Sequence, residues 1–206
     1  MQVQHLVVGM FETNSYIISG NCPGKCLLID PADNGKMIIK TLEAAKLVPE
    51  AILLTHGHYD HFLAVPDLQK KWPDLPVYCH PLDCPKETIE YDMGMAFPTV
   101  TAFDHVKPLA EGKKLHLAGF EILVMHTPGH TPGSVIFFIE DAMFSGDTLF
   151  CGSIGRTDFA GGSVTQMGTS LKRIAALTGD YKVYPGHEFL TTLKKEKASN
   201  PYLMLL

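Results

Sequence analysis

The feature that most constrains this chain is a group of four potential metal ligands within six residues, His56-Gly57-His58-Tyr59-Asp60-His61. The group directly follows an apolar stretch at residues 51–54, which has the character of a buried strand. Imidazole nitrogens and carboxylate oxygens are the groups that bind zinc and related metals in proteins. A polar surface loop is a poor explanation for this spacing, so the pattern predicts a metal site at the end of a buried strand.

These residues alone do not complete a catalytic metal site, because a hydrolytic metal needs three or more protein ligands and an open position for water. Three later segments repeat one plan, in which an apolar strand is followed by a glycine turn and a single ligand. The segments lie at residues 120–133, 144–148 and 183–187. The ligands that they supply are His130, Asp147 and His187.

In the order and spacing of these seven residues, the chain resembles the metallo-β-lactamase superfamily over nearly its whole length. The context of Gly57 and Tyr59, the Thr-Pro-Gly-His-Thr-Pro-Gly loop at residues 127–133 and the closing Pro-Gly-His at residues 185–187 look most like small bacterial proteins related to glyoxalase II (hydroxyacylglutathione hydrolase), a thioester hydrolase. The resemblance implies one metal bound by His56, His58 and His130, a second bound by Asp60, His61 and His187, and Asp147 as a bridge between them.

The order of the expected elements indicates an α/β protein. Strands are expected near residues 2–8, 15–19, 26–29, 51–54, 77–79 and 120–125, and helices near 36–46, 65–72 and 167–174 and from about 188 to 197. A hairpin is expected to turn at Ala118-Gly119, and residues 85–105 are poorly patterned. The resemblance refines this reading to a four-layer αββα sandwich, in which two mixed sheets are packed face to face with helices outside and the metal site lies at one edge.

Length and composition predict a single domain over residues 1–206. In comparison with glyoxalase II, we expect no additional C-terminal helical substrate domain. A net charge of −5 disfavours nucleic acid as a partner, and no apolar run is long enough to cross a membrane. The N-terminus lacks the pattern of an export signal, so we expect a cytoplasmic protein that acts on a small molecule. The oligomeric state stays open. Five cysteines are an odd number, so a disulfide framework is not expected.

The ligand set fits metal-assisted hydrolysis. A water held between two cations loses a proton near neutral pH, and the resulting bridging hydroxide attacks a carbonyl carbon that one metal polarises. Asp60 is the candidate catalytic residue, because it can orient that hydroxide as well as bind metal. A thioester suits such a site because its thiolate leaving group needs little proton donation. Zinc is the favoured metal, with iron or manganese left open.

Other functions compete with this one. Residues 155–159 also resemble the corresponding segment of persulfide dioxygenases, relatives that hold a single iron and consume oxygen. Hydrolysis of another ester or of an amide is a further alternative. A β-lactamase is weaker, because the clinically important zinc enzymes have a cysteine where this chain has Asp147. In glyoxalase II, much of the contact with glutathione comes from a C-terminal helical domain, which we do not expect in this chain. The identity of the thiol in the substrate therefore stays open.

Three residues outside the ligand set are further candidates. Asp30 ends a strand and, by resemblance, supports the ligand loops without touching metal. Arg156 follows Asp147 by a short loop and could bind a substrate carboxylate through paired hydrogen bonds. Pairing with Asp158 is an equally good explanation of that arginine. Cys151 lies four residues after Asp147, where packing is favoured over a chemical role.

Overall fold

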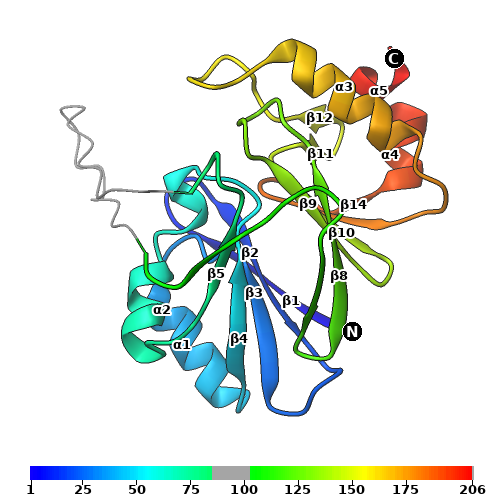
Figure 1. Ribbon diagram of the computed structural model, residues 1–206. Helices are drawn as coiled ribbons and strands as arrows, with labels where there is room; N and C mark the ends of the chain where they lie inside the picture. The colour runs from blue at the N-terminus through cyan, green and yellow to red at the C-terminus, as the bar shows by residue number, and fades with distance from the viewer. Residues whose placement is uncertain (85–102, 206) are drawn as a thin grey trace.

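The computed structural model describes residues 1–84 and 103–205, which form two six-stranded sheets and five helices (Figure 1). In the first sheet the strands are adjacent in chain order, with β1 to β3 antiparallel and β3 to β6 parallel. Its strands are β1 (Gln2–Val8), β2 (Thr13–Ser19), β3 (Lys25–Ile29), β4 (Val48–Leu53), β5 (Val77–Cys79) and β6 (Val106–Pro108).

The second sheet has the order β14-β13-β10-β9-β8-β7 and is antiparallel except between β10 and β13. Because β9 runs against both of its neighbours, β8, β10 and β13 share one direction, and their C-terminal ends meet at one edge. The strands are β7 (Lys114–Leu117), β8 (Phe120–His126), β9 (Val135–Ile139), β10 (Ala142–Gly146), β13 (Lys182–Pro185) and β14 (Thr191–Thr192). A separate hairpin joins β11 (Leu149–Phe150) to β12 (Ser153–Ile154).

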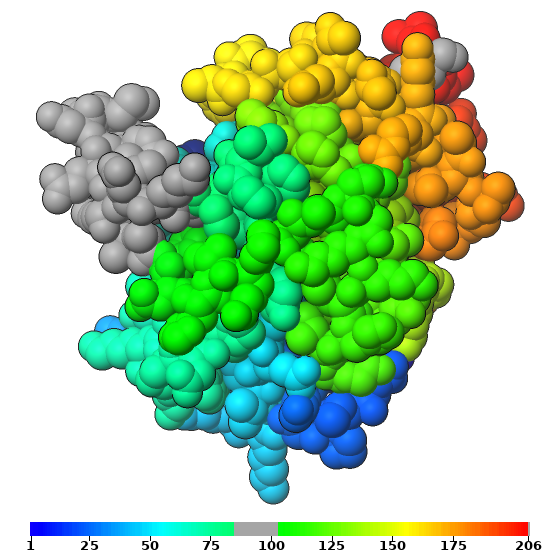
Figure 2. Space-filling view, in the orientation of Figure 1, coloured from blue at the N-terminus to red at the C-terminus, as the bar shows by residue number. Residues whose placement is uncertain are grey.

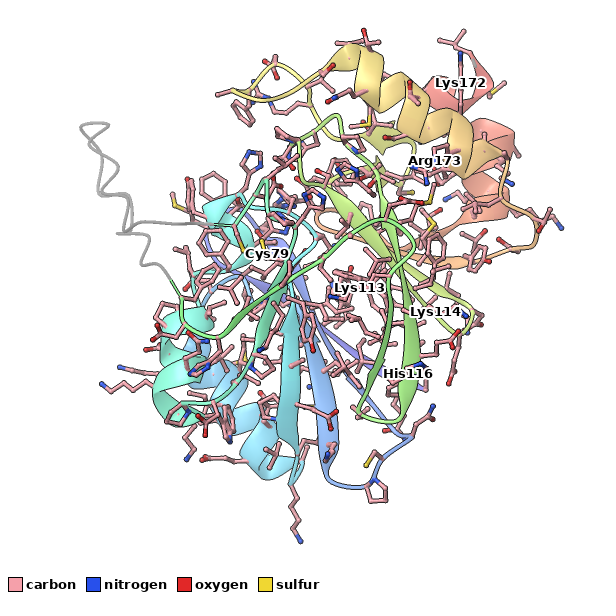
Figure 3. All side chains as sticks on the ribbon, in the orientation of Figure 1. Cys79, Lys113, Lys114, His116, Lys172 and Arg173 are labelled. Carbon is pink, nitrogen blue, oxygen red and sulfur yellow. The ribbon has the colours of Figure 1, made fainter. Side chains whose placement is uncertain are left out.

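The inner strands β2, β3 and β4 of the first sheet are largely buried on both faces, because each face is covered there. On β3, Leu27 and Ile29 belong to the core between the sheets, whereas Cys26 and Leu28 face the helix layer. The core between the sheets includes Phe137 from the second sheet. Figure 3 shows the side chains that fill this space.

The helices cover the outer faces of the two sheets. The helices α1 (Gly35–Ala44) and α2 (Val65–Lys71) pack on the first sheet, and α3 (Val164–Ala175), α4 (Leu193–Ser199) and α5 (Pro201–Met204) pack on the second. On α3, Met167, Leu171 and Ile174 form the buried stripe at helical spacing. On the face shown in Figure 2, the β6–β8 region (green) lies between the first pair of helices (cyan to teal) and the C-terminal segment (orange). The four-layer αββα sandwich of two mixed sheets is therefore confirmed.

Most expected elements are present, with differences at their ends. Ala118 and Gly119 both have positive φ angles, 49° and 81°, as a tight two-residue hairpin turn requires. The helix expected from Glu188 is wrong in its start: Glu188 has a φ of 64°, the short strand β14 follows, and α4 begins only at Leu193. The Thr192 hydroxyl accepts a hydrogen bond from the backbone N–H of Lys195 and so caps that helix.

Two observations complete the description of the fold. Most of the poorly patterned stretch at residues 85–105 lies outside the described residues. Among the helices that the structure describes, none combines the length and apolar character needed to cross a membrane.

Candidate metal centre

The predicted ligands converge at one edge of the sandwich because each follows the C-terminal end of a strand. The loop after β4 supplies His56 and His58, and a short 3₁₀ turn, Tyr59–His61, supplies the next two ligands. The segments after β8, β10 and β13 supply one residue each. The structure brings all seven predicted ligands into two clusters and one shared carboxylate: His56, His58 and His130; Asp60, His61 and His187; and Asp147.

The first cluster consists of three imidazoles whose ligand atoms lie within 4.8 Å of one another. The Nδ1 atom of His58 lies 3.1 Å from Nε2 of His56 and 2.8 Å from Nε2 of His130. Burial and the neighbouring imidazoles hold the pKa of His56 well below its usual value, and burial lowers the pKa of His58 to about 4. Neutral imidazoles are the form that binds metal, so this cluster is suited to a cation.

The second cluster combines two imidazoles with a carboxylate. His187 Nε2 lies 3.3 Å from both His61 Nε2 and Asp60 Oδ2. Burial would lower the pKa of His61, but the adjacent Asp147 carboxylate and the hydrogen bond to Asp30 outweigh it and raise the pKa to about 10. The surrounding carboxylates therefore favour positive charge at this point, which either a proton or a metal ion can supply.

Asp147 lies between the two clusters. Its Oδ1 is 3.5 Å from His61 Nε2, and its Oδ2 is 3.5 Å from His130 Nε2. Among the described residues, Oδ1 is the one buried side-chain N or O atom without a hydrogen-bond partner. A buried carboxylate oxygen without a partner is costly in free energy unless a cation lies beside it. The donor set thus fits two metal ions that share Asp147.

Hydrogen bonds on the far side of the imidazole rings fix their orientation. His130 Nδ1 lies 2.7 Å from the Arg156 carbonyl oxygen, and His187 Nδ1 lies 3.1 Å from the Phe11 carbonyl oxygen. An Nδ1–H that donates to a carbonyl leaves Nε2 as an acceptor, which faces the centre in both residues. These contacts select the tautomer that can bind metal.

Asp30 lies within hydrogen-bond distance of Thr55, which precedes His56, and of His61. Its Oδ1 accepts a hydrogen bond from the Thr55 backbone N–H at 2.8 Å, and its Oδ2 accepts one from the Thr55 hydroxyl at 2.6 Å. The same Oδ2 lies 2.9 Å from His61 Nδ1. Asp30 therefore joins the strand end that precedes His56 to the ring of His61.

Asp83, which the sequence analysis missed, joins the loops that carry His58 and His130. Its Oδ2 accepts hydrogen bonds from the Gly57 backbone N–H at 3.0 Å and from the Thr131 hydroxyl at 2.5 Å. Its Oδ1 accepts a hydrogen bond from the Gly133 backbone N–H at 2.7 Å. No sequence signal marked this residue, because two of its three donors are backbone groups.

The two glycines that contact Asp83 have no room for a side chain. A Cβ at Gly57 would lie 2.1 Å from the Asp83 carbonyl oxygen, and one at Gly133 would lie 2.6 Å from the Asp83 carboxyl carbon. The glycines of the ligand motifs thus allow this close approach.

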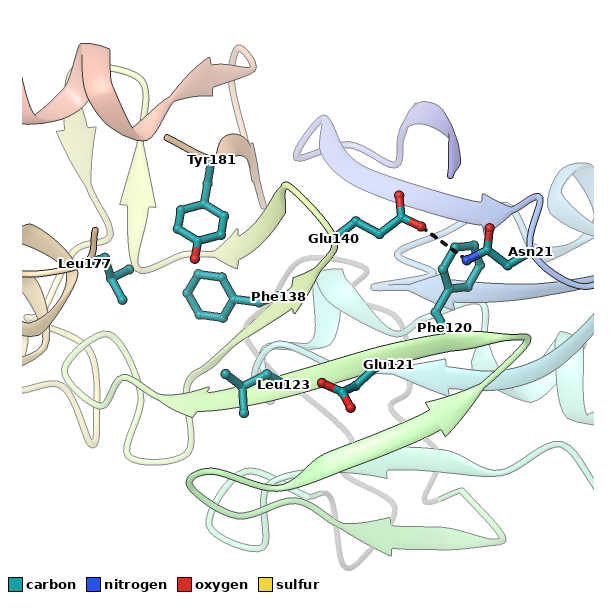
Figure 4. A pocket seen from close by; sticks show the side chains of 8 residues that line it. All are labelled: Asn21, Phe120, Glu121, Leu123, Phe138, Glu140, Leu177 and Tyr181. Carbon is teal, nitrogen blue, oxygen red and sulfur yellow. Dashed lines mark hydrogen bonds between the residues drawn. The ribbon is translucent and has the colours of Figure 1, made fainter. Parts of the chain in front are cut away.

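A pocket of about 920 Å³ opens over the centre. Five of the proposed ligands line it, together with Arg156, Glu188 and a set of mostly apolar side chains: Phe11, Tyr59, Phe150, Ser153, Ile154, Phe159 and Ala160. A second hollow, of about 440 Å³, lies on the outer face of the second sheet, where Leu123, Phe138 and Tyr181 face it (Figure 4). None of the described residues that line this hollow is a histidine or cysteine, and none is a proposed metal ligand.

Arg156 lines the pocket but is already paired. Its Nε and one terminal nitrogen each lie 2.7 Å from a carboxylate oxygen of Asp158, and its guanidinium carbon lies 3.8 Å from the centre of the Phe159 ring. The pairing with Asp158 that the sequence left open is thus present. Cys151 is partly buried, and its sulfur lies 3.6 Å from the Lys195 ammonium nitrogen.

Comparison with known proteins relates this arrangement to one family. The model of the family described as "Metallo-beta-lactamase superfamily" matches residues 8–187. The "Probable metallo-hydrolase YqgX" of Bacillus subtilis is 35% identical over 212 residues, which cover 98% of each chain. A "Hydroxyacylglutathione hydrolase" of Xylella fastidiosa is 38% identical over 177 residues, which cover 85% of this chain and 60% of that protein.

Solved structures agree over nearly the whole chain. The BLEG-1 B3 metallo-beta-lactamase has a TM-score of 0.88 and 35% identity, covering 98% of this chain and 99% of that one. TTHA1623, solved in a di-iron-bound form, has a TM-score of 0.85 and 39% identity, covering 98% of this chain and 100% of that one. These likenesses extend across both sheets and include the segments that carry all seven proposed ligands.

Proposed function

The chain belongs to the metallo-beta-lactamase superfamily, and we propose that within it this protein is a dinuclear metal-dependent hydrolase of thioesters. Its His and Asp clusters are consistent with a site for two metal ions. The observation that carries the proposal is Asp147, which lies 3.5 Å from a ligand atom of each cluster and keeps one buried oxygen without a hydrogen-bond partner. A carboxylate in this position favours two cations over one.

The proposed assignment gives each metal three residues of its own. His56, His58 and His130 would hold the first and Asp60, His61 and His187 the second, with Asp147 shared. Zinc is the favoured metal, because histidine and carboxylate ligands suit it. Iron is supported by the di-iron form of the relative TTHA1623, and manganese stays open. When bound, two such ions would polarise a carbonyl group and lower the pKa of a water molecule between them.

Asp60 is the proposed catalytic residue of the chain itself. Although burial would raise its pKa, the hydrogen bond to His187 and the neighbouring His61 hold that pKa well below its usual range. Its carboxylate therefore stays ionised and lines the pocket, with Oδ2 3.3 Å from the Thr13 hydroxyl. An ionised oxygen here can accept a hydrogen bond from the attacking water and orient it toward the carbonyl carbon.

A thioester is the favoured substrate for two reasons. The departing thiolate is a weak base, so the reaction needs little help from a proton donor, in contrast to amide hydrolysis. The similarity to a hydroxyacylglutathione hydrolase over 85% of this chain supports the same chemistry. Other esters and amides remain the next candidates.

A mononuclear iron persulfide dioxygenase is the competing proposal. It would hold its iron with His56, His130 and Asp147 and would leave the second cluster without a metal. The ligand atoms of Asp60, His61 and His187 lie within 4.8 Å of one another, a convergence that favours the dinuclear hydrolase.

The test combines metal analysis with two assays on the same protein preparation. We expect about two metal ions per chain, release of thiol from thioesters of glutathione, coenzyme A or smaller thiols, and no oxygen uptake with glutathione persulfide. His187→Ala should lose one metal and the thioesterase activity together. A preparation with one iron per chain that consumes oxygen, and that keeps this activity in His187→Ala, would establish the dioxygenase instead.

Several expectations from the sequence stay predictions. These are a single domain over residues 1–206, a cytoplasmic location and a small-molecule substrate in place of nucleic acid or a membrane. The supporting role of Asp30 and a substrate contact by Arg156 are likewise proposals.

A further inference from the structure

We propose that the substrate of this site is a thioester with an uncharged, apolar acyl group, such as an aryl-substituted or medium-chain aliphatic acyl group. This inference rests on the proposed thioesterase function and narrows it. The walls of the pocket beside the candidate metal centre and the charges that line it carry the argument.

Three phenylalanines line the pocket, and two of them stand against a histidine ring of the centre. Phe159 packs edge-on against His58 with ring centroids 5.7 Å apart, and Phe150 packs edge-on against His187 at 6.2 Å. Phe11 packs against Tyr59 at 5.9 Å. The three residues come from the loop before α3, from β11 and from the loop between β1 and β2. Apolar walls therefore border the centre on several sides.

These walls are unusually open to solvent. Phe11 is 44% exposed and Phe159 is 46% exposed, although both line a pocket. Exposed aromatic side chains that gather at a cleft indicate a surface covered by a ligand. An apolar group placed against them would remove both the rings and itself from water.

The charges that line the pocket oppose an anionic acyl group. Apart from the proposed metal ligands, the charged residues of the described lining are Arg156 and Glu188. Arg156 directs Nε and one terminal nitrogen to the two carboxylate oxygens of Asp158, so its charge is already balanced before a substrate carboxylate arrives. A carboxylate would also lie in the same pocket as Glu188.

The lysines of α4 do not add a positive charge to the lining of the pocket. Lys195 and Lys197 are absent from the described lining, and their ammonium groups contact Cys151 and the Leu177 carbonyl oxygen. Apart from the metal ions proposed at the centre, the part of the pocket that the structure describes thus offers no cation that lacks an anionic partner, and desolvating an unpaired carboxylate is unfavourable. The carbonyl carbon must lie at the centre, so both groups attached to it lie in this pocket, and the proposal places the acyl group against the apolar walls.

The test is a series of thioesters that share one neutral thiol, N-acetylcysteamine, and differ only in the acyl group. With metal-loaded protein, we expect kcat/KM to rise roughly four-fold for each methylene from acetyl to hexanoyl. Phenylacetyl should exceed acetyl by about ten-fold or more. Succinyl has a carboxylate in place of the terminal ethyl group of pentanoyl. Its thioester should be hydrolysed no faster than the acetyl thioester.

Variants of the walls test whether the preference comes from this pocket. Phe159→Ala should reduce the ratio of hexanoyl to acetyl kcat/KM about ten-fold, and Phe159→Leu should restore most of it, because leucine retains an apolar wall. Phe189→Ala is the matched control, since Phe189 is 80% exposed and is not part of the described lining. The control should leave the ratio unchanged.

The outcomes separate this inference from the proposed function. Hydrolysis of the whole series with a flat profile, or with succinyl preferred over pentanoyl, overturns the apolar acyl preference and leaves the thioesterase intact. An unchanged ratio in Phe159→Ala also overturns it. No hydrolysis above that of metal-free protein for any thioester overturns both proposals.

Discussion

Replacing Asp83 with asparagine tests whether this carboxylate holds the first metal cluster together. Asp83 accepts three hydrogen bonds, from the backbone N–H groups of Gly57 and Gly133 and from the Thr131 hydroxyl. An asparagine has one acceptor oxygen, so its amide NH₂ must face at least one of the two backbone donors. That donor loses its partner in a partly buried place.

The size of the effect follows from these contacts. Leaving a buried donor unsatisfied costs about 1–3 kcal/mol, so the free energy of unfolding should fall by about 2 kcal/mol in Asp83→Asn. In this variant, residue 83 holds together less firmly the two loops that carry His58 and His130. The ligand nitrogens of these two histidines lie 2.8 Å apart. Loss of a group that orients metal ligands typically weakens metal binding by about 10-fold to 100-fold. We expect this weakening of metal binding at the first cluster alone.

The assay is a competitive titration of the metal-free protein against a chromophoric chelator, which resolves two binding phases. Asp30→Asn is the matched variant, because Asp30 contacts His61 of the second cluster at 2.9 Å and Thr55 beside His56 of the first, so it should weaken both phases. Asp141→Asn removes an exposed ion pair with Lys182 and should alter neither phase. Equal weakening of both phases in Asp83→Asn, or unchanged binding with reduced stability, would refute selective positioning of the first cluster.

Four further changes have expected outcomes. Asp147→Ala should leave less than one metal per chain by elemental analysis and abolish hydrolysis, because both clusters lose a shared anion; two retained metals would exclude a bridging role. Gly155→Ala should lower the free energy of unfolding in urea by more than about 2 kcal/mol, since its Cβ would lie 1.8 Å from the Asp147 carbonyl oxygen. Gly168→Ala, with no atom within 4 Å on a helix, should instead raise it by roughly 0.5–1 kcal/mol. Arg156→Ala should change kcat/KM equally for neutral and carboxylate-bearing thioesters; a selective rise in KM for the latter would show that Arg156 leaves its present partner to bind substrate.

The convergence of the proposed ligands could be predicted from the sequence, because metal binding limits the choice of residue and strand ends limit their placement. Each of His130, Asp147 and His187 follows an apolar strand and a glycine turn, and the parallel directions of β8, β10 and β13 bring those strand ends to one edge. The sandwich itself was predicted through the family resemblance, since hydrophobic periodicity distinguishes α/β from other classes but does not determine how two sheets face each other.

Features that depend on backbone donors or on neighbouring charges could not be read in this way. Every residue except proline has a backbone N–H, so the bonds from Gly57 and Gly133 to Asp83 leave no pattern of residue types. Arg156 and Asp158 are two residues apart, and the sequence supported a free guanidinium as well as a paired one. The start of α4 was misplaced because the polar character of residues 188–192 does not distinguish a helix from the turn and short strand that precede the Thr192 cap.

The arrangement of ligands also ties metal binding to the packing of the two sheets. In each proposed cluster two ligands follow β4 of the first sheet, and the third, His130 or His187, follows a strand of the second. Each metal would therefore link the sheets across the core. A ligand that binds only the folded state adds about 2.7 kcal/mol of stability at a hundred-fold excess over its dissociation constant. Chelation should thus loosen the contact between the sheets as well as remove activity, so the centre stabilises the same sandwich that positions it.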